Sequence, residues 1–469
     1  MFQHVSPSHP TSSASPNAWR PLARACALAV LGMAGSLSAQ AENLVELYQA
    51  ARGYDAAYLA AKLQFDAAQF KADQARSLQR PSVNLQATVK RNRLDSSQPD
   101  AINPLTGGVA SYDSTSTNSQ LAVAARQPLF NQSNAAKVAQ AEASLTAAQA
   151  DLKMAEDDLV ARLAQAYFDV LSAQDVLATA QANKKALAEQ LASAKRSFEV
   201  GNSTITDTRE AQARFDLASA QEIAATNDLR VKRIALDQFV GRADVKPNPL
   251  RTPVNLDALA PGQIDTWVQS TGTAPMVRKA EVGLKVARLE VDNARATHLP
   301  TLDAVAQVAR THVDTNNQLV KAQSGSGTAG SIGLEFNMPL YAGNAIQNRV
   351  RETLSLQDKA ERDLENARRG VELGTRQAYS GVQSGLAQVK AYEAAEASAK
   401  LALEATQLGY RVGVRINKDV LDAQTQLTNT QKDLYKARYD VIIGAIKLRQ
   451  AAGTLTSDDL VELNKLVTP

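Results

Sequence analysis

Phe198-Glu-Val-Gly201-Asn-Ser-Thr-Ile-Thr-Asp207 and Tyr410-Arg-Val-Gly413-Val-Arg415-Ile-Asn-Lys-Asp419 interrupt two long alanine-rich helical patterns in nearly the same way. A shift of 212 residues places the first Val-Gly pair on the second and Asp207 on Asp419. The same shift places Gly241 on Gly453. A repeat of this length is one structural half used twice, because a solenoid unit is much shorter. The sequence therefore predicts a fold built on an internal duplication.

The first 41 residues have the pattern of an export signal. Arg20 and Arg24 precede an apolar run over about 25–37, and Ala39-Gln40-Ala41 follows as a small-residue cleavage site. This run is much shorter than the roughly 18 to 20 apolar residues that a spanning helix needs. We therefore expect residues 1–41 to be a signal peptide. The single cysteine, Cys26, lies in this segment, so we expect no disulfide and no lipid anchor.

Charge and motifs argue against nucleic-acid binding and against catalysis. The net charge is +3, and two of the basic residues belong to the leader, so the exported part is nearly neutral. Neither G-x-x-x-x-G-K-[ST] nor H-E-x-x-H occurs. A G-x-G-x-x-G match at 325–330 enters an alternating stretch and not a helix, so we interpret it as a flexible loop. We expect no catalytic residues, no metal and no cofactor.

Two long helical hairpins are predicted, one in each half of the chain. Residues 131–196 contain no proline or glycine, and Leu145, Leu152 and Leu159 recur every seven residues, as in a coiled coil. A helix of this length spans on the order of 100 Å. Alanine buries little apolar area per residue, so an isolated hairpin of this kind would be marginally stable. The sequence therefore indicates an oligomeric helical wall.

Four stretches alternate between apolar and polar residues, two in each half. Val83 and Leu85, for example, alternate with Asn84 and Gln86. Runs of about ten such residues match tilted membrane strands. An ordinary half-buried sheet is the alternative, but little sequence remains to cover it. Four strands cannot close a barrel alone, so we expect several copies to share one barrel.

The sequence predicts the following organisation. A signal peptide at 1–41 is followed by a first structural repeat at 42–240, which has strands at about 82–93 and 118–128 and a helical hairpin at 131–240. An equatorial linker region at 241–273 leads to a second structural repeat at 274–453, which has strands at about 301–310 and 330–339 and a helical hairpin at 343–453. A C-terminal equatorial segment at 454–469 follows. Phe130 and Tyr341 follow strands at positions where membrane barrels carry interfacial aromatic residues.

Over nearly its whole exported length the chain resembles the TolC family of outer-membrane channel proteins. The resemblance rests on residues 42–52, on the turns Pro128-Leu-Phe130 and Pro339-Leu-Tyr341, and most of all on 410–423. It implies an α+β membrane protein, in which a homotrimer has a shared twelve-stranded outer-membrane barrel, four strands per chain, continuous with a periplasmic helical barrel. It also implies a passive exit duct for efflux or type I secretion that works with a periplasmic adaptor and an inner-membrane ABC or proton-driven pump.

The resemblance also assigns gate residues at the periplasmic tip. Asp207 would accept closed-state contacts from Tyr410 and Arg415, while Asp419 and Asp422 would point into the constriction. Residues three apart share a helix face, so threefold symmetry would gather six carboxylates, which favour cations. Helix capping is the competing interpretation for these aspartates, and for Asp207 it takes the form of an acidic variant of the capping box.

The turns between the helices are the expected docking surface for an adaptor, with Val200, Gly201, Val412 and Gly413 at their centre. Val414 and Asn417 depart from the family pattern, which bears on the strength of the closed state. The alternative to a channel is a non-channel periplasmic coiled-coil adaptor or scaffold protein. Such a protein would have long hairpins but not the two strand pairs.

Overall fold

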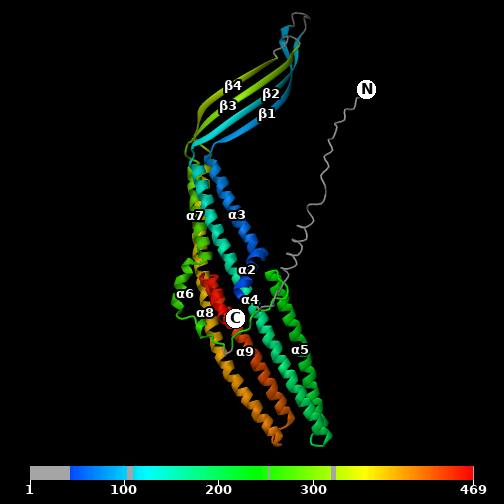
Figure 1. Ribbon diagram of the computed structural model, residues 1–469. Coiled ribbons are helices and arrows are strands. Elements are labelled where there is room, and N and C mark those ends of the chain that lie inside the picture. The colour runs from blue at the N-terminus through cyan, green and yellow to red at the C-terminus, as the bar shows by residue number, and fades with distance from the viewer. Residues whose placement is uncertain (1–42, 103–108, 252–253, 318–323, 468–469) are drawn as a thin grey trace, which may run out of the picture.

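The computed structural model describes residues 43–102, 109–251, 254–317 and 324–467, so the expected signal peptide lies outside the described residues. The molecule is elongated (Figure 1), with the strands at one end and the turns of two helical hairpins at the other. The short helices α6 and α10 lie near the middle of the rod. Among the described helices, none is long and apolar enough to cross a membrane.

The order of elements repeats, as the duplication predicts. The helices are α2 Leu44–Tyr54, α3 Ala56–Arg76, α4 Gln132–Glu199, α5 Ile205–Val240, α6 Ile264–Ser270, α7 Pro275–Ala296, α8 Ala345–Arg411, α9 Asn417–Ala452 and α10 Asp458–Asn464, and the strands are β1 Ser82–Ile102, β2 Val109–Phe130, β3 Thr301–Asn317 and β4 Gly325–Asn337. Each half thus supplies two strands and one long hairpin. The G-x-G-x-x-G stretch at 325–330 lies within β4, so its interpretation as a flexible loop was wrong.

The four strands form one antiparallel sheet in the order β1-β2-β3-β4. One face is apolar and exposed, with Leu85 opposite Val123 and Val123 opposite Val308 in the register. The other face carries amides and hydroxyls, for example Gln86 and Thr88. The strands run further than the alternation predicts, because polar residues beyond it continue the same ladder. Within the described part of the chain β1 and β4 each pair on one side only, so the sheet has two open edges.

The glycines that end the hairpins cap their helices in the left-handed conformation. Gly241 has φ +73° and Gly453 has φ +70°. Each also lies against the start or end of another helix. A Cβ on Gly241 would meet the ring of Tyr54, and a Cβ on Gly453 would meet the backbone of Ala274. The end of α2 therefore lies against the end of α5, and the start of α7 lies against the end of α9.

The N-terminal helical segment is interrupted at Asp55, between α2 and α3. The Asp55 side chain accepts a 2.7 Å hydrogen bond from Tyr58 N–H, which caps α3. Arg162 of α4 also binds this carboxylate at 3.0 Å. A buried aspartate with an ion-pair partner favours the cap over the helix interior.

The main core lies at the middle of the rod, where both halves meet. Tyr167 and Phe168 of α4 are fully buried and pack edge to face with ring centroids 5.3 Å apart. They are joined by Leu47 of α2, Ile442 of α9 and Leu460 of α10. The buried clusters along the two hairpins are smaller than this one. This core therefore holds the first and last helices of the chain to both hairpins.

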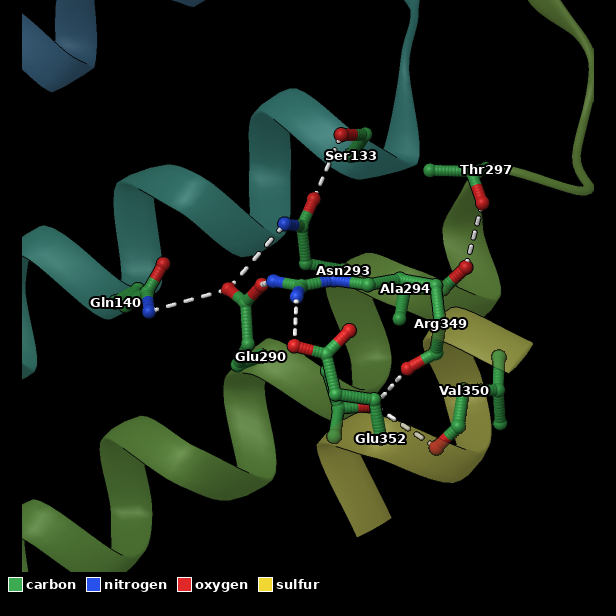
Figure 2. Close-up of polar contacts among 10 residues, drawn as sticks. Ser133, Gln140, Glu290, Asn293, Ala294, Thr297, Arg349, Val350 and Glu352 are labelled. Atoms are coloured by element: carbon green, nitrogen blue, oxygen red, sulfur yellow. Dashed lines mark hydrogen bonds and ion pairs between the residues drawn. The ribbon is translucent and has the colours of Figure 1, made fainter. Parts of the chain in front are cut away.

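A polar junction joins three helices just below the sheet (Figure 2). Glu290 of α7 accepts from Arg349 of α8 at 2.6 Å and from Gln140 of α4 at 3.3 Å. Asn293 lies one turn further along α7 and accepts from Ser133 of α4 at 2.7 Å. Charge-assisted bonds of this kind are directional. The junction therefore fixes the position of α7 between the two long helices.

A partly buried hydrogen bond joins the two halves at the edge of the main core. The Tyr439 hydroxyl of α9 donates to Asp175 of α4 at 2.6 Å. Burial raises the pKa of Asp175, and the hydrogen bond from Tyr439 and the charge of Arg438 oppose this rise without cancelling it. The folded protein therefore binds a proton here at pH values where the unfolded chain has released it. Proton binding by Asp175 therefore stabilises the folded protein fully at pH values below the ordinary pKa of an aspartate. This stabilisation is lost as the pH rises through the raised pKa of Asp175 in the folded protein.

Asp175→Asn should therefore stabilise the protein near neutral pH. The variant keeps an acceptor for Tyr439 and removes the buried charge, a gain of up to about 1 kcal/mol after allowance for partial exposure. The thermal loss of the helical circular dichroism signal, followed near neutral pH and near the ordinary aspartate pKa, measures it. The advantage should shrink at the lower pH. Asp175→Ala, which leaves the hydroxyl unpaired, should be destabilising at both, and an advantage of Asp175→Asn independent of pH would contradict this account.

Candidate functional site

The two hairpin turns have the same backbone hydrogen bonds. At the first turn, Val200 N–H donates to Arg196 at 3.1 Å and Asn202 N–H donates to Ser197 at 2.8 Å. At the second, Val412 N–H donates to Leu408 at 3.1 Å and Val414 N–H donates to Gly409 at 2.9 Å. Each pattern closes a helix through a left-handed glycine, Gly201 with φ +79° and Gly413 with φ +83°. The sequence repeat at the tips is therefore a structural repeat.

The helices that follow the turns begin differently. Thr204 caps α5 and forms a reciprocal capping box with Asp207, whose carboxylate accepts from Thr204 N–H at 3.0 Å. Asp207 was expected to begin such a box, but it is the third helical residue of one that Thr204 begins. Helix α9 has Ile416 at the corresponding position and no side-chain cap there. The start of α5 is thus capped by side chains, and the start of α9 is not.

In the single chain, the side chains of the residues assigned to closed-state links contact residues of their own hairpin. Tyr410 packs against the apolar cluster of Leu403, Val420 and Leu427. Arg415 lies 3.6 Å from Asp419, one turn along α9. The Asp207 carboxylate is bound to Thr204, and a link from it to Tyr410 or Arg415 stays a prediction.

Apart from the backbone carbonyl of Asp207, the contacts described below between the hairpins come from residues for which no link was expected. Asn417 is buried, with 2% of its surface exposed, and its amide oxygen accepts from Gln190 of α4 at 2.5 Å. Its amide nitrogen donates to the carbonyl of Asp207 at 3.4 Å. Above it, Asn183 of α4 accepts from Thr428 of α9 at 3.0 Å. These amides form a polar seam between α4 and α9.

Asp422 is paired with two cations. Arg214 of α5 lies 2.7 Å from one carboxylate oxygen, and Lys418 of α9 lies 2.6 Å from the other. The hydrogen bond from Lys418 holds the pKa of Asp422 below its ordinary value. The sequence alone shows that Asn417 departs from the family pattern. It does not identify Arg214 as a partner of Asp422, because the two residues are 208 positions apart and belong to different halves of the chain.

Apolar side chains project from both tips. Val200, Val412, Val414 and Ile416 are each 60% or more exposed. Exposed valines and isoleucines clustered at the end of a rod are typical of a protein interaction surface. The residues expected to dock an adaptor are therefore accessible in the single chain.

Comparisons with known proteins agree with this architecture. Residues 47–242 and 268–454 match the family model described as outer membrane efflux protein. The chain is 32% identical to outer membrane protein TolC of Vibrio cholerae over 434 residues, which cover 92% of this chain and 95% of that protein. It is 28% identical to the proteases secretion protein PrtF of Dickeya chrysanthemi over 450 residues, which cover 92% of this chain and 93% of that one.

A solved structure gives the same result for the fold. The Campylobacter jejuni CmeC outer membrane channel superposes with a TM-score of 0.72 at 16% identity, covering 90% of this chain and 89% of that one. The predicted α+β fold class is confirmed, and the outer membrane is the location that these similarities support. With matches of this extent in both halves, the chain belongs to the outer membrane efflux protein family.

Proposed function

We propose that three copies of this chain form an exit duct that carries substrates passively across the periplasm and the outer membrane, for efflux or type I secretion. One observation carries the proposal: a sheet with an exposed apolar face lies in line with two hairpins whose first helices have 68 and 67 residues, or about 100 Å each. The two open sheet edges need partners, and identical chains supply them by closing a barrel. Relatives named for efflux and for protease secretion support the same role.

The partners follow from the same arrangement. Among the described residues, no group of His, Cys, Asp or Glu side chains could hold a metal ion. A passive duct takes its energy from elsewhere, so we assign the supply of energy to an inner-membrane ABC or proton-driven pump. A periplasmic adaptor would bridge pump and duct by binding the turns at Gly201 and Gly413, where valines are exposed.

The gate of the duct is assigned to the hairpin tips. Asp419 and Asp422 would face the axis of the trimer, where threefold symmetry gathers their carboxylates. Asp207, Tyr410 and Arg415 would fasten the hairpins in the closed state. Partly exposed links of this kind contribute no more than about 1 kcal/mol each, so an adaptor would be able to open them.

Arg415→Ser and Asp207→Asn should each raise the resting conductance of the purified protein in a planar lipid bilayer. Loss of one link in each of three chains shifts the closed state by about 1 to 3 kcal/mol, or roughly 5-fold to 150-fold. Trimers should persist, as judged by heat-modifiable migration on gels. Lys359→Gln, which removes the exposed pair with Asp363 on α8, is the matched control. Unchanged conductance in both Arg415→Ser and Asp207→Asn would contradict the assignment of Arg415 and Asp207 to the gate.

A further inference from the structure

The acidic ring expected at the constriction is compensated within each chain. Asp422 lies between Arg214 and Lys418, and Asp419 lies 3.6 Å from Arg415. Two carboxylates are thus paired with three cations. Glu210 is the further acidic group near Lys418. Asp419 and Asp422 are therefore both compensated within a single chain.

The two cations around Asp422 differ in where they are attached. Lys418 lies one turn before Asp422 on the same helix, so this pair moves with α9 as a unit. Arg214 belongs to α5 of the other hairpin. Its position is set by its neighbours on that helix, because Ala211 and Ala218 are buried in one cluster with Leu421 of α9. The contact between Arg214 and Asp422 therefore forms only when the two hairpins are packed together.

We propose that Arg214 couples the opening of this duct to its ion selectivity, an inference that rests on the proposed function. In the closed state Arg214 fastens α5 to α9 and neutralises Asp422. When the hairpins separate, Arg214 withdraws and Asp422 keeps only Lys418. The two carboxylates of each chain, Asp419 and Asp422, then face two cations where they faced three. The entrance thus loses one positive charge per chain as it opens, which raises its preference for cations.

The test compares Arg214→Gln with the wild-type trimer in planar bilayers, using conductance and the reversal potential in a potassium chloride gradient. Removing the pair from three chains should raise the closed-state conductance at least about fivefold. The ratio of cation to anion permeability should rise as well, and more at low than at high ionic strength. Arg214→Lys, which keeps the charge, should retain the wild-type selectivity.

Lys232→Gln is the matched control, because the Lys232 pair with Asp169 joins α5 to α4 within one hairpin at 3.0 Å and has similar exposure. It should leave conductance and selectivity unchanged. Asp422→Asn should raise conductance but lower cation preference, and adding Arg214→Gln to it should change little more, since the two residues act as a pair.

Three results would overturn the inference. If wild-type trimers conduct and Arg214→Gln matches them in both conductance and selectivity, the coupling is wrong and the proposed function stands. If correctly folded wild-type trimers do not conduct at all, the proposed function fails and this inference fails with it. Equal effects of Arg214→Gln and Lys232→Gln would also contradict it, because only the first pair joins the two hairpins.

Discussion

Gly453→Ala is expected to remove nearly all folded protein. Gly453 caps α9 with φ +70°, and an added Cβ would lie 2.4 Å from the Cα of Ala274 and 2.7 Å from its Cβ. Ala274 is buried and is the N-cap residue of α7, so the atoms in the way are its Cα and Cβ, which cannot rotate aside. The left-handed conformation costs a residue with a side chain about 1 to 2 kcal/mol, and the overlap adds about 1 to 3 kcal/mol or more. Losses of this size approach the whole stability of many domains.

The duplication supplies a matched control for this prediction. Gly241 occupies the same place in the first half with φ +73°, but its Cβ would meet the ring of Tyr54 at 2.5 Å. That side chain is 57% exposed and can rotate away, so Gly241→Ala should cost mainly the backbone strain. The yield of heat-modifiable trimer and its melting temperature measure both variants. If the two substitutions are equally harmful, steric overlap with α7 is not the cause.

Residue patterns predict the parts of this fold that depend on local preference. The two Val-Gly turns, the glycine caps and the alternating strands each follow from the chemistry of a few neighbouring residues. The glycine caps at Gly241 and Gly453 are in the left-handed conformation that helix ends favour. Because both halves repeat these signals, each occurrence supports the other.

The features that sequence patterns missed depend on partners from distant parts of the chain. The helix break at Asp55 needs Arg162, more than a hundred residues away, to stabilise a buried carboxylate. The seam between the hairpins needs Asn417 beside Gln190, whose separation is 227 residues. A resemblance to a family supplied candidate gate residues, but not the local partners that each acquires here. The resemblance therefore does not reveal the ion pair of Asp422 with Arg214, because its two members belong to different hairpins.

The second large effect is expected at the base of the sheet, where three charged residues lie on neighbouring strands. Asp303 of β3 stands directly opposite Glu335 of β4 in the register. Like charges in this position repel and destabilise the strand pair. Arg126 of β2 binds Asp303 at 2.6 Å, and the aspartate side chain is only 4% exposed. The arginine therefore compensates a buried carboxylate that faces a second one.

Arg126→Ala should greatly reduce the amount of heat-resistant trimer in the outer-membrane fraction. Removing one partner of a buried pair costs about 3 to 5 kcal/mol, and the 55% exposure of Arg126 places the expected loss at the lower end, about 3 kcal/mol. The harm comes from the carboxylate left behind and not from the missing guanidinium. Adding Asp303→Asn should therefore restore most of the trimer, and Asp303→Asn alone should be mild. If the double variant assembles as poorly as Arg126→Ala, the arginine acts through packing on the strand and charge compensation is not its role.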